Sequence, residues 1–219
     1  MRRLALSLLF TIAAGLAHAG PVQVVPADDP DVAAGWAAYR GDNLAKAIEY
    51  YRKAAARNER VAQFNLAIML MAGEGGPADP LEGVGWLRKS ADLGFARAQY
   101  ALGLLYERGE HVSRSLTEAT KWFRRAAEGC HRDAQVSLGT QYFLGRGAIR
   151  DYREAARWYE RAAEQGDEGS AYIVASLYEK GDGVAQDRVR AFYWYSRAAA
   201  GGDPAAIYKA REMREQLSR

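Results

Sequence analysis

Apolar residues in the middle of the chain follow two successive helical patterns. In the first, Ala98, Leu102 and Leu105 recur at the spacing of one helix face, and Gly109 ends the pattern. A loop of about five residues follows, and the second pattern then places Trp122 and several alanines on one face. A short loop between two amphipathic segments is typical of an antiparallel helix pair. The pattern therefore predicts two antiparallel helices.

The same pattern returns every 36 residues. The residue types that repeat at this step are tryptophan, glycine and alanine, at Trp86, Trp122, Trp158 and Trp194, at Gly73, Gly109, Gly145 and Gly181, and at Ala91, Ala127, Ala163 and Ala199. Several series on one spacing indicate a structural repeat, and a period of 20–50 residues is typical of stacked supersecondary units. We therefore expect a stack of helix pairs, with Trp and Ala-Ala packing inside it.

Polar residues mark the start of the second helix in each repeat. Good N-cap residues precede it at Asp79, Ser115, Asp151 and Asp187. Three residues later, a glutamate completes three predicted capping boxes, at Glu82, Glu118 and Glu154. Arg190 breaks the pattern in the fourth copy. Proline is suited to a first helical position, and Pro80 and Pro204 follow aspartates in this way.

These residues resemble the Sel-1-like repeat, a relative of the tetratricopeptide repeat. The best match is the segment 170–202, which has Tyr178, Gly181, Gly183, Val184, Asp187, Ala191, Trp194, Tyr195, Ala198 and Ala199. The resemblance covers residues 62–202, with local departures such as His111 in place of the second loop glycine. It implies an all-α fold, an α/α solenoid wound as a right-handed superhelix, and a role in protein–protein contacts.

The period divides the chain into five predicted parts. Residues 1–19 form a signal peptide, 20–30 an extended lead-in, and 31–61 an N-terminal cap that resembles a tetratricopeptide helix pair. Residues 62–203 form four Sel-1-like repeats, and 204–219 a C-terminal capping helix.

The first residues predict export. Arg2 and Arg3 precede an apolar run, and Ala17-His18-Ala19 has the small-x-small pattern that a signal peptidase recognises. The run is shorter than the roughly 20 residues that span a bilayer, so we expect a cleaved leader, no membrane segment afterwards, and a periplasmic or secreted protein. Cleavage lowers the formal net charge from +3 to about +1, which gives no basis for nucleic-acid binding.

Candidate catalytic or metal-binding groups are sparse. The histidines after the leader, His111 and His131, are expected in solvent-exposed loops, without metal-ligand spacing. Cys130 occupies a position that is glycine in three other repeats, and we expect a free thiol at a helix end. Such a thiol can link two copies in an oxidising compartment. We predict no catalytic, metal-binding or cofactor-binding residues and no cofactor.

An aromatic series at the repeat spacing is the candidate binding surface. Alignment of the tetratricopeptide pattern places one residue per repeat toward a concave groove, aromatic in each case except Val136, with two further lines of residues along the helices. The predicted partner-binding residues are Phe64, Ile68, Tyr100, Leu104, Thr140, Phe143, Tyr172, Ser176 and Tyr208. Packing of these side chains between repeats is an equally good interpretation, because the repeat spacing alone generates such a series.

Three functions follow from these observations. The first is a scaffold, adaptor or regulator of the bacterial cell envelope that binds a protein or peptide partner. The alternative is an envelope protein that binds peptidoglycan or polysaccharide through the same rings. A cell-wall hydrolase of the β-lactamase-like kind is the third, and it is disfavoured because the chain has no Ser-x-x-Lys motif and lacks the disulfide-forming cysteines of the cysteine-rich members of the family.

Overall fold

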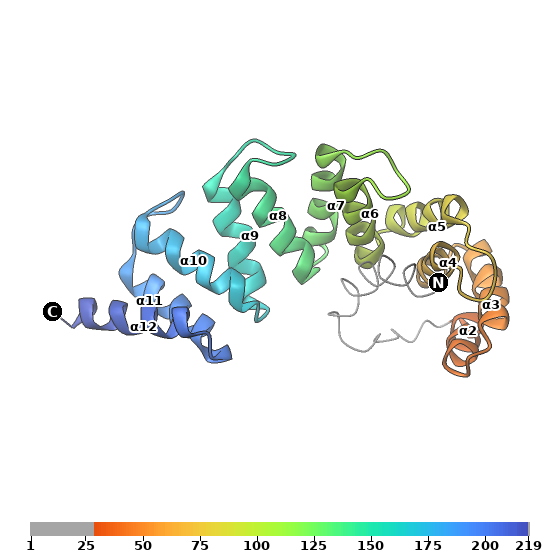
Figure 1. Cartoon of the computed structure of the whole chain (residues 1–219), viewed down its shortest axis with the longest axis horizontal. Coiled ribbons are helices and arrows are strands. Elements are labelled where there is room, and N and C mark those ends of the chain that lie inside the picture. The colour runs from red at the N-terminus through yellow and green to blue at the C-terminus, as the bar shows by residue number, and fades with distance from the viewer. Residues whose placement is uncertain (1–28, 219) are drawn as a thin grey trace, which may run out of the picture. The chain divides into compact units, whose positions relative to one another are not determined.

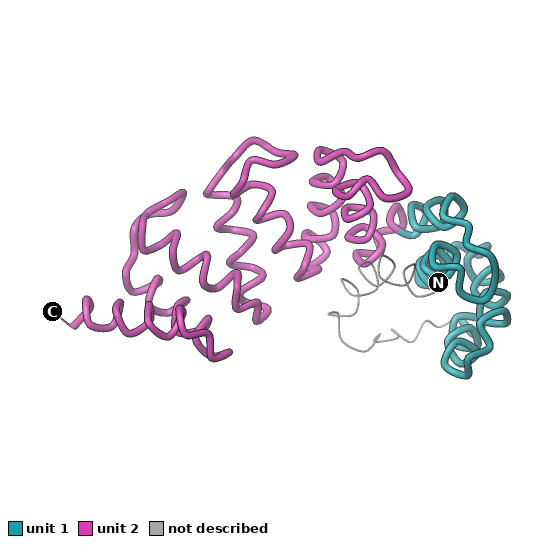
Figure 2. The backbone as a smooth tube through the Cα atoms, viewed as in Figure 1, with its two compact units in different colours: residues 1–90 teal, residues 91–219 magenta. Residues whose placement is uncertain are grey.

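Helices form where the 36-residue pattern predicts them. The computed structural model describes residues 29–218, and these residues contain helices and their connections but no strand. The chain divides into two compact units, residues 1–90 and 91–219 (Figure 2). Unit 1 contains α2 (Pro30–Arg40), α3 (Leu44–Ala56), α4 (Arg60–Ala72) and most of α5 (Pro80–Asp92). The predicted signal peptide, residues 1–19, lies outside the described residues.

Unit 2 is a row of helices in which each packs against the next in sequence (Figure 1). Its members are α6 (Ala96–Arg108), α7 (Leu116–Glu128), α8 (Arg132–Leu144), α9 (Tyr152–Glu164), α10 (Glu168–Lys180), α11 (Arg188–Ala198), the short 3-10 helix η1 (Ala199–Gly201) and α12 (Pro204–Leu217). This arrangement confirms the all-α fold of stacked helix pairs.

Long and short connections alternate along unit 2. The two helices of a repeat are joined by residues 109–115, 145–151 or 181–187, whereas repeats are joined by the three-residue turns 129–131 and 165–167. The long loops therefore have seven residues, against the five expected, because each also includes the C-cap glycine and the N-cap residue. They lie along one edge of the row (Figure 1).

The predicted N-caps are confirmed. The predicted return bond of each capping box, from the backbone N–H of the N-cap residue to the glutamate side chain, is wrong. The side chains of Asp79, Ser115, Asp151 and Asp187 all accept hydrogen bonds from the first turn of the helix that follows. The backbone N–H of Asp151, however, donates to the carbonyl of Tyr142, 3.0 Å away. Glu154 instead accepts from the indole N–H of Trp158 at 3.2 Å. A carbonyl from the preceding helix has thus replaced the glutamate as the partner of the N-cap residue.

Most of the repeated alanines and two of the four repeated tryptophans pack in the interior, whereas Trp86 and Trp122 are half-buried. Trp158 and Trp194 are only 2% and 5% exposed, and the paired alanines of α7 and α9 are buried. The aromatic residue that follows the tryptophan in α7 and in α9 packs against a glycine of the neighbouring first helix. Phe123 lies directly against Gly103, and Tyr159 lies against Gly139, where an added Cβ would be 3.0 Å from the ring. The first helix therefore leaves room for the ring.

Buried glutamines join consecutive repeats, a feature that the sequence analysis missed. Each donates its side-chain amide to the carbonyl of an alanine at the end of the preceding helix. The pairs are Gln63 with Ala55 at 3.2 Å, Gln99 with Ala91 at 3.0 Å, and Gln135 with Ala127 at 3.2 Å. The three glutamines are spaced by 36 residues, and Ala171 takes the fourth position. Burial makes these bonds costly to lose.

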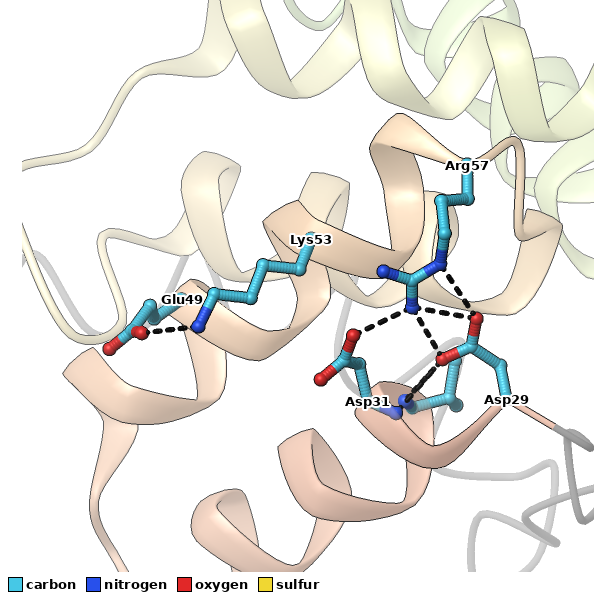
Figure 3. A network of polar contacts seen from close by, with 6 residues as sticks. Asp29, Asp31, Glu49, Lys53 and Arg57 are labelled. Carbon is cyan, nitrogen blue, oxygen red and sulfur yellow. Dashed lines mark hydrogen bonds and ion pairs between the residues drawn. The ribbon is translucent and has the colours of Figure 1, made fainter.

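The described part of unit 1 begins with a network of polar contacts (Figure 3). Asp29 is the N-cap of α2 and Pro30 its first residue, so the predicted lead-in at 20–30 extends too far. The Arg57 guanidinium, just after α3, lies 2.8 Å from both carboxylate oxygens of Asp29 and 2.7 Å from Asp31. Its hydrogen bonds lower the pKa of Asp29. The start of α2 is thereby attached to the end of α3.

The last helix covers the final repeat as predicted. It begins at Pro204, with the Asp203 side chain as its N-cap. Ala206 and Met213 are buried. Lys209 lies 3.0 Å from Glu179 of α10 and the same distance from Glu212. The apolar side chains close the core of unit 2, and the ion pair between Lys209 and Glu179 joins α12 to α10.

Candidate interaction surface of the second unit

The predicted aromatic series divides into buried, half-buried and exposed members. Tyr100 and Leu104 are 9% and 8% exposed and belong to the core of unit 2. The Tyr100 ring lies 5.7 Å from that of Phe123 and 4.6 Å from that of His131, measured between centroids. The expectation that these two side chains face an open groove is therefore wrong, because neighbouring helices cover them.

Other members of the series pack between helices while part of their surface stays exposed to solvent. Phe143 meets Tyr152 edge-on at 5.3 Å, and Tyr172 meets Tyr195 at 5.2 Å. The remaining half-buried members are Phe64, Ile68, Thr140 and Ser176. Thr140 shares a 2.8 Å hydrogen bond with the Tyr159 hydroxyl. Much of the predicted series thus contributes to packing, and its role in binding stays a prediction.

Tyr208 on α12 is the exception, with 67% of its surface exposed. Other large apolar side chains are also exposed in unit 2, and they lie mostly outside the predicted series. Leu144 and Ile149 are 50% and 91% exposed around the α8–α9 loop, and Val189 and Tyr193 are 64% and 50% exposed on α11. The loop edge and α11 therefore present more apolar surface than the predicted groove residues.

His131 differs from the expected exposed loop histidine. It is the N-cap of α8, and its Nδ1 accepts a hydrogen bond from the backbone N–H of Ala134 at 3.3 Å. Burial lowers the pKa of this imidazole, and the nearby charges of Arg97 and Arg132 lower it further. The carboxylate of Asp133 acts in the opposite direction and raises the pKa. A neutral ring that accepts a backbone N–H has a structural role. His111 is exposed in its loop, as predicted.

Cys130 is an exposed free thiol, as predicted. Its backbone has φ of +61°, the left-handed conformation that glycine adopts at the equivalent Gly94, Gly166 and Gly202. Within residues 29–218, no cluster of three or more His, Cys, Asp or Glu side chains is arranged to hold a metal ion. Over the same range, no helix combines the length and apolar character needed to cross a bilayer.

An open hollow of about 990 Å³ lies at the loop edge of unit 2, between two consecutive repeats. One wall is the start of α9, residues 150–153, and the other is the α10–α11 loop with the first turn of α11. The walls meet at Gly183, whose φ is +73° and where a Cβ would overlap the backbone of Tyr152. Only glycine permits this approach.

Three arginines line the hollow. Arg190 donates to the Tyr178 hydroxyl at 2.8 Å and lies 3.6 Å from Asp187. Arg150 and Arg153 form no ion pair with any residue of the range 29–218. The aspartates of the hollow, Asp151 and Asp187, are the N-caps of α9 and α11 and accept backbone N–H groups. Three arginines against two aspartates give the lining a formal charge of 3 − 2 = +1.

The sequence alone does not reveal this hollow, although one of its residues departs from the repeat pattern. Arg190 stands where the other three repeats have glutamate, and this departure was visible in the capping pattern. Arg150 and Arg153 lie about 40 residues earlier and carry no motif of their own. Only the stacking of consecutive repeats brings the three side chains to one hollow.

Comparison with known proteins shows where this architecture recurs. The family model described as Sel1 repeat matches residues 29–59, 60–95, 96–129, 132–167 and 169–203. It therefore counts five repeats and includes the helix pair that the sequence analysis classed as tetratricopeptide-like. No curated protein matches the chain significantly in sequence.

Two solved structures are similar over most of the chain. A Sel1 repeat protein from Oxalobacter formigenes has a TM-score of 0.76 and 32% identity, over 83% of this chain and 74% of that one. The protein c5321, a protective antigen of uropathogenic Escherichia coli strains with an SLR fold, has a TM-score of 0.74 and 32% identity. That match covers 94% of this chain but 43% of c5321, so the chain spans less than half of that relative.

Proposed function

Because this chain belongs to the Sel1 repeat family, whose repeats generally serve as protein-interaction scaffolds, we propose that it binds a protein partner in the bacterial cell envelope. The partner would dock on unit 2, and the chain would act as an adaptor or regulator by holding it. The observation that carries this proposal is the exposed apolar surface at the loop edge and on the last helices.

Large exposed apolar side chains are costly to keep in water and commonly mark binding surfaces when they occur together. In unit 2, Ile149 is exposed at the α8–α9 loop, Val189 and Tyr193 on α11, and Tyr208 on α12. Tyrosine supplies a large contact area with few rotatable bonds and keeps a polar group for hydrogen bonding. Rigid helices hold these side chains in place, which reduces the entropy lost on binding.

The envelope location rests on the N-terminal leader pattern. Two arginines, an apolar run and Ala17-His18-Ala19 fit cleavage by a signal peptidase. An exported chain would meet partners of the periplasm or the cell exterior. Mass spectrometry of the N-terminus of the protein from its own host would test this part, since a chain beginning at Gly20 is expected.

A glycan partner is the second candidate. The exposed rings of Tyr193 and Tyr208 favour it, because an exposed aromatic face can stack on a sugar ring. This reading predicts retention on peptidoglycan or polysaccharide that depends on the two rings. Exposed Ile149 and Val189 favour the protein partner instead, because aliphatic side chains offer no such stacking.

Affinity capture with the tagged chain 20–219 from an envelope extract separates the two candidates. The matched variants are the double substitution Tyr193→Ala/Tyr208→Ala and the control Leu93→Ala, which changes an exposed side chain elsewhere in unit 2. A protein held by the wild type and the control, and lost by the double variant, is the expected result. Retention of glycan alone would favour the second candidate, and capture of neither would overturn both.

A further inference from the structure

We propose that the arginine-lined hollow between the start of α9 and the α10–α11 loop binds an acidic segment of the protein partner. Carboxylates of that segment would pair with Arg150, Arg153 and Arg190, and neighbouring aliphatic residues would contact Ile149 and Val189. The inference rests on the proposed scaffold function and adds the chemistry of what is bound.

The charge balance of the hollow favours an anion. Acidic side chains near the arginines are already engaged: Glu154 accepts from the Trp158 indole at 3.2 Å, and Glu160 accepts from the Tyr178 hydroxyl at 3.4 Å. Arg150 lies over the Tyr152 ring at 5.8 Å, and within residues 29–218 neither Arg150 nor Arg153 forms an ion pair. Guanidinium binds carboxylate with two parallel hydrogen bonds.

The three arginines occur together at a single junction of the 36-residue period. Arg190 corresponds to Glu82, Glu118 and Glu154, so three repeats have a negative side chain where the fourth has a positive one. Arg153 corresponds to Thr117 and Val189 in the neighbouring repeats of unit 2. Arg114 corresponds to Arg150 in the preceding repeat and Lys46 corresponds to Arg190 in the first, but neither of those repeats has all three basic residues. A binding role accounts for their presence together.

Exposed aliphatic residues beside the arginines favour a polypeptide over a phosphate polymer or a glycan. Ile149 precedes Arg150 and is 91% exposed, and Val189 precedes Arg190 and is 64% exposed. Val184 and Ala185 add apolar surface to the wall of the hollow. An extended peptide that alternates acidic and aliphatic residues satisfies both kinds of surface, whereas a polyphosphate satisfies only the arginines.

The sharpest variant is Arg190→Glu, because it restores the residue type found in three of the other repeats. The Asp187 N-cap accepts the backbone N–H of residue 190 and does not depend on its side chain. A glutamate there also has the spacing to accept from the Trp194 indole, as Glu154 does from Trp158. The variant should therefore fold, with a small decrease in melting temperature from the loss of the Arg190 contacts to Tyr178 and Asp187. Arg211→Glu on the exposed face of α12 makes the same charge change outside the hollow and serves as control.

The probe is a fluorescein-labelled 12-residue peptide in which Glu and Asp alternate with Leu and Val, measured by anisotropy against the full chain. A peptide with Gln and Asn in place of the acids is its neutral match. We expect Arg190→Glu, and the pair Arg150→Gln/Arg153→Gln, to raise Kd for the acidic peptide about tenfold or more. Arg211→Glu should change it less than about twofold, and added salt should weaken binding.

Three outcomes would overturn the inference. They are equal affinity for the acidic and neutral peptides, no effect of Arg190→Glu, and tighter binding of inorganic polyphosphate than of the peptide. The scaffold function is tested separately by capture from the extract. A partner that the Arg190→Glu variant captures as well as the wild type does would leave the scaffold function standing and remove the hollow as its site.

Discussion

The side-chain amide of Gln135 donates a hydrogen bond to the backbone carbonyl of Ala127, 3.2 Å away, and so joins α8 to the end of the preceding repeat. Gln135 is 2% exposed, and its own carbonyl oxygen accepts from Gln165 at 2.7 Å. A fully buried amide has no access to water as a substitute partner. The hydrogen bond therefore connects two consecutive repeats, and water cannot replace it when the amide is removed.

Replacing Gln135 with alanine should lower the free energy of unfolding by about 1–3 kcal/mol, because the Ala127 carbonyl then remains buried without its side-chain donor. Urea denaturation followed by circular dichroism measures the change. Gln216→Ala removes the same chemical group from α12, where it bonds only within its own helix, and should have a much smaller effect. Equal losses in the two variants would contradict the inter-repeat role.

Cys130→Gly should stabilise the chain by about 1 kcal/mol. Cys130 has φ of +61°, a conformation that costs a residue with a side chain about 1–2 kcal/mol and costs glycine little. The greater conformational entropy of glycine in the unfolded chain offsets part of this gain. Gly166→Cys tests the reverse at the equivalent position, where an added Cβ meets open space, and should lose a similar amount. Thermal melts under reducing conditions measure both. A stabilising Gly166→Cys would disprove the argument.

The free energy of unfolding should decrease as the pH falls below about 6.5, the ordinary pKa of histidine. Burial lowers the pKa of His131 in the folded state, so the unfolded chain binds more protons and acid favours unfolding. This contribution is fully present above pH 6.5 and is lost as the pH falls toward and below the folded pKa.

His131→Asn isolates that effect, because asparagine is a good N-cap and does not titrate. Urea midpoints of the wild type and the variant at pH 8 and pH 5 give the comparison. The difference between the two pH values should be smaller in the variant. An unchanged difference would assign the acid sensitivity to other groups.

Asp29→Ala should destabilise unit 1 by about 1 kcal/mol, because it removes the N-cap of α2. Asp29→Asn keeps the cap and loses the charge that Arg57 binds, so it should cost less. Glu49→Gln, which breaks only the exposed pair with Lys53 on α3 (Figure 3), is the control and should have no measurable effect. Hydrogen exchange of the first-turn amides of α2 measures each step. Faster exchange in Glu49→Gln than in Asp29→Ala would contradict this order.

Local chemistry made the helices and their starts predictable. An aspartate or serine followed by a helical pattern specifies an N-cap within four residues, and Asp151 or Ser115 needs no distant partner to do so. The second partner in each box was not predictable. Glu154 is equally placed for its own N-cap N–H and for the Trp158 indole, and the Tyr142 carbonyl of another helix decides between them.

The candidate surface was less predictable, because exposure depends on what covers a side chain. Tyr100 and Tyr208 occupy equivalent positions in the 36-residue period, yet His131 stacks on the first and the second lies on the last helix. A spacing argument treats them alike. The arginines of the hollow come from separate segments that carry no shared motif, so only the packed repeats show that they share one hollow.

The walls of the hollow belong to two different repeats, and they touch where Gly183 meets Tyr152. A ligand in the hollow would therefore contact two consecutive repeats at once. By mass action, any ligand that needs both walls in place also holds them in place. A bound ligand would then raise the force needed to separate α9 from α11. Conversely, a force that pulls the two repeats apart would lower the affinity for the ligand.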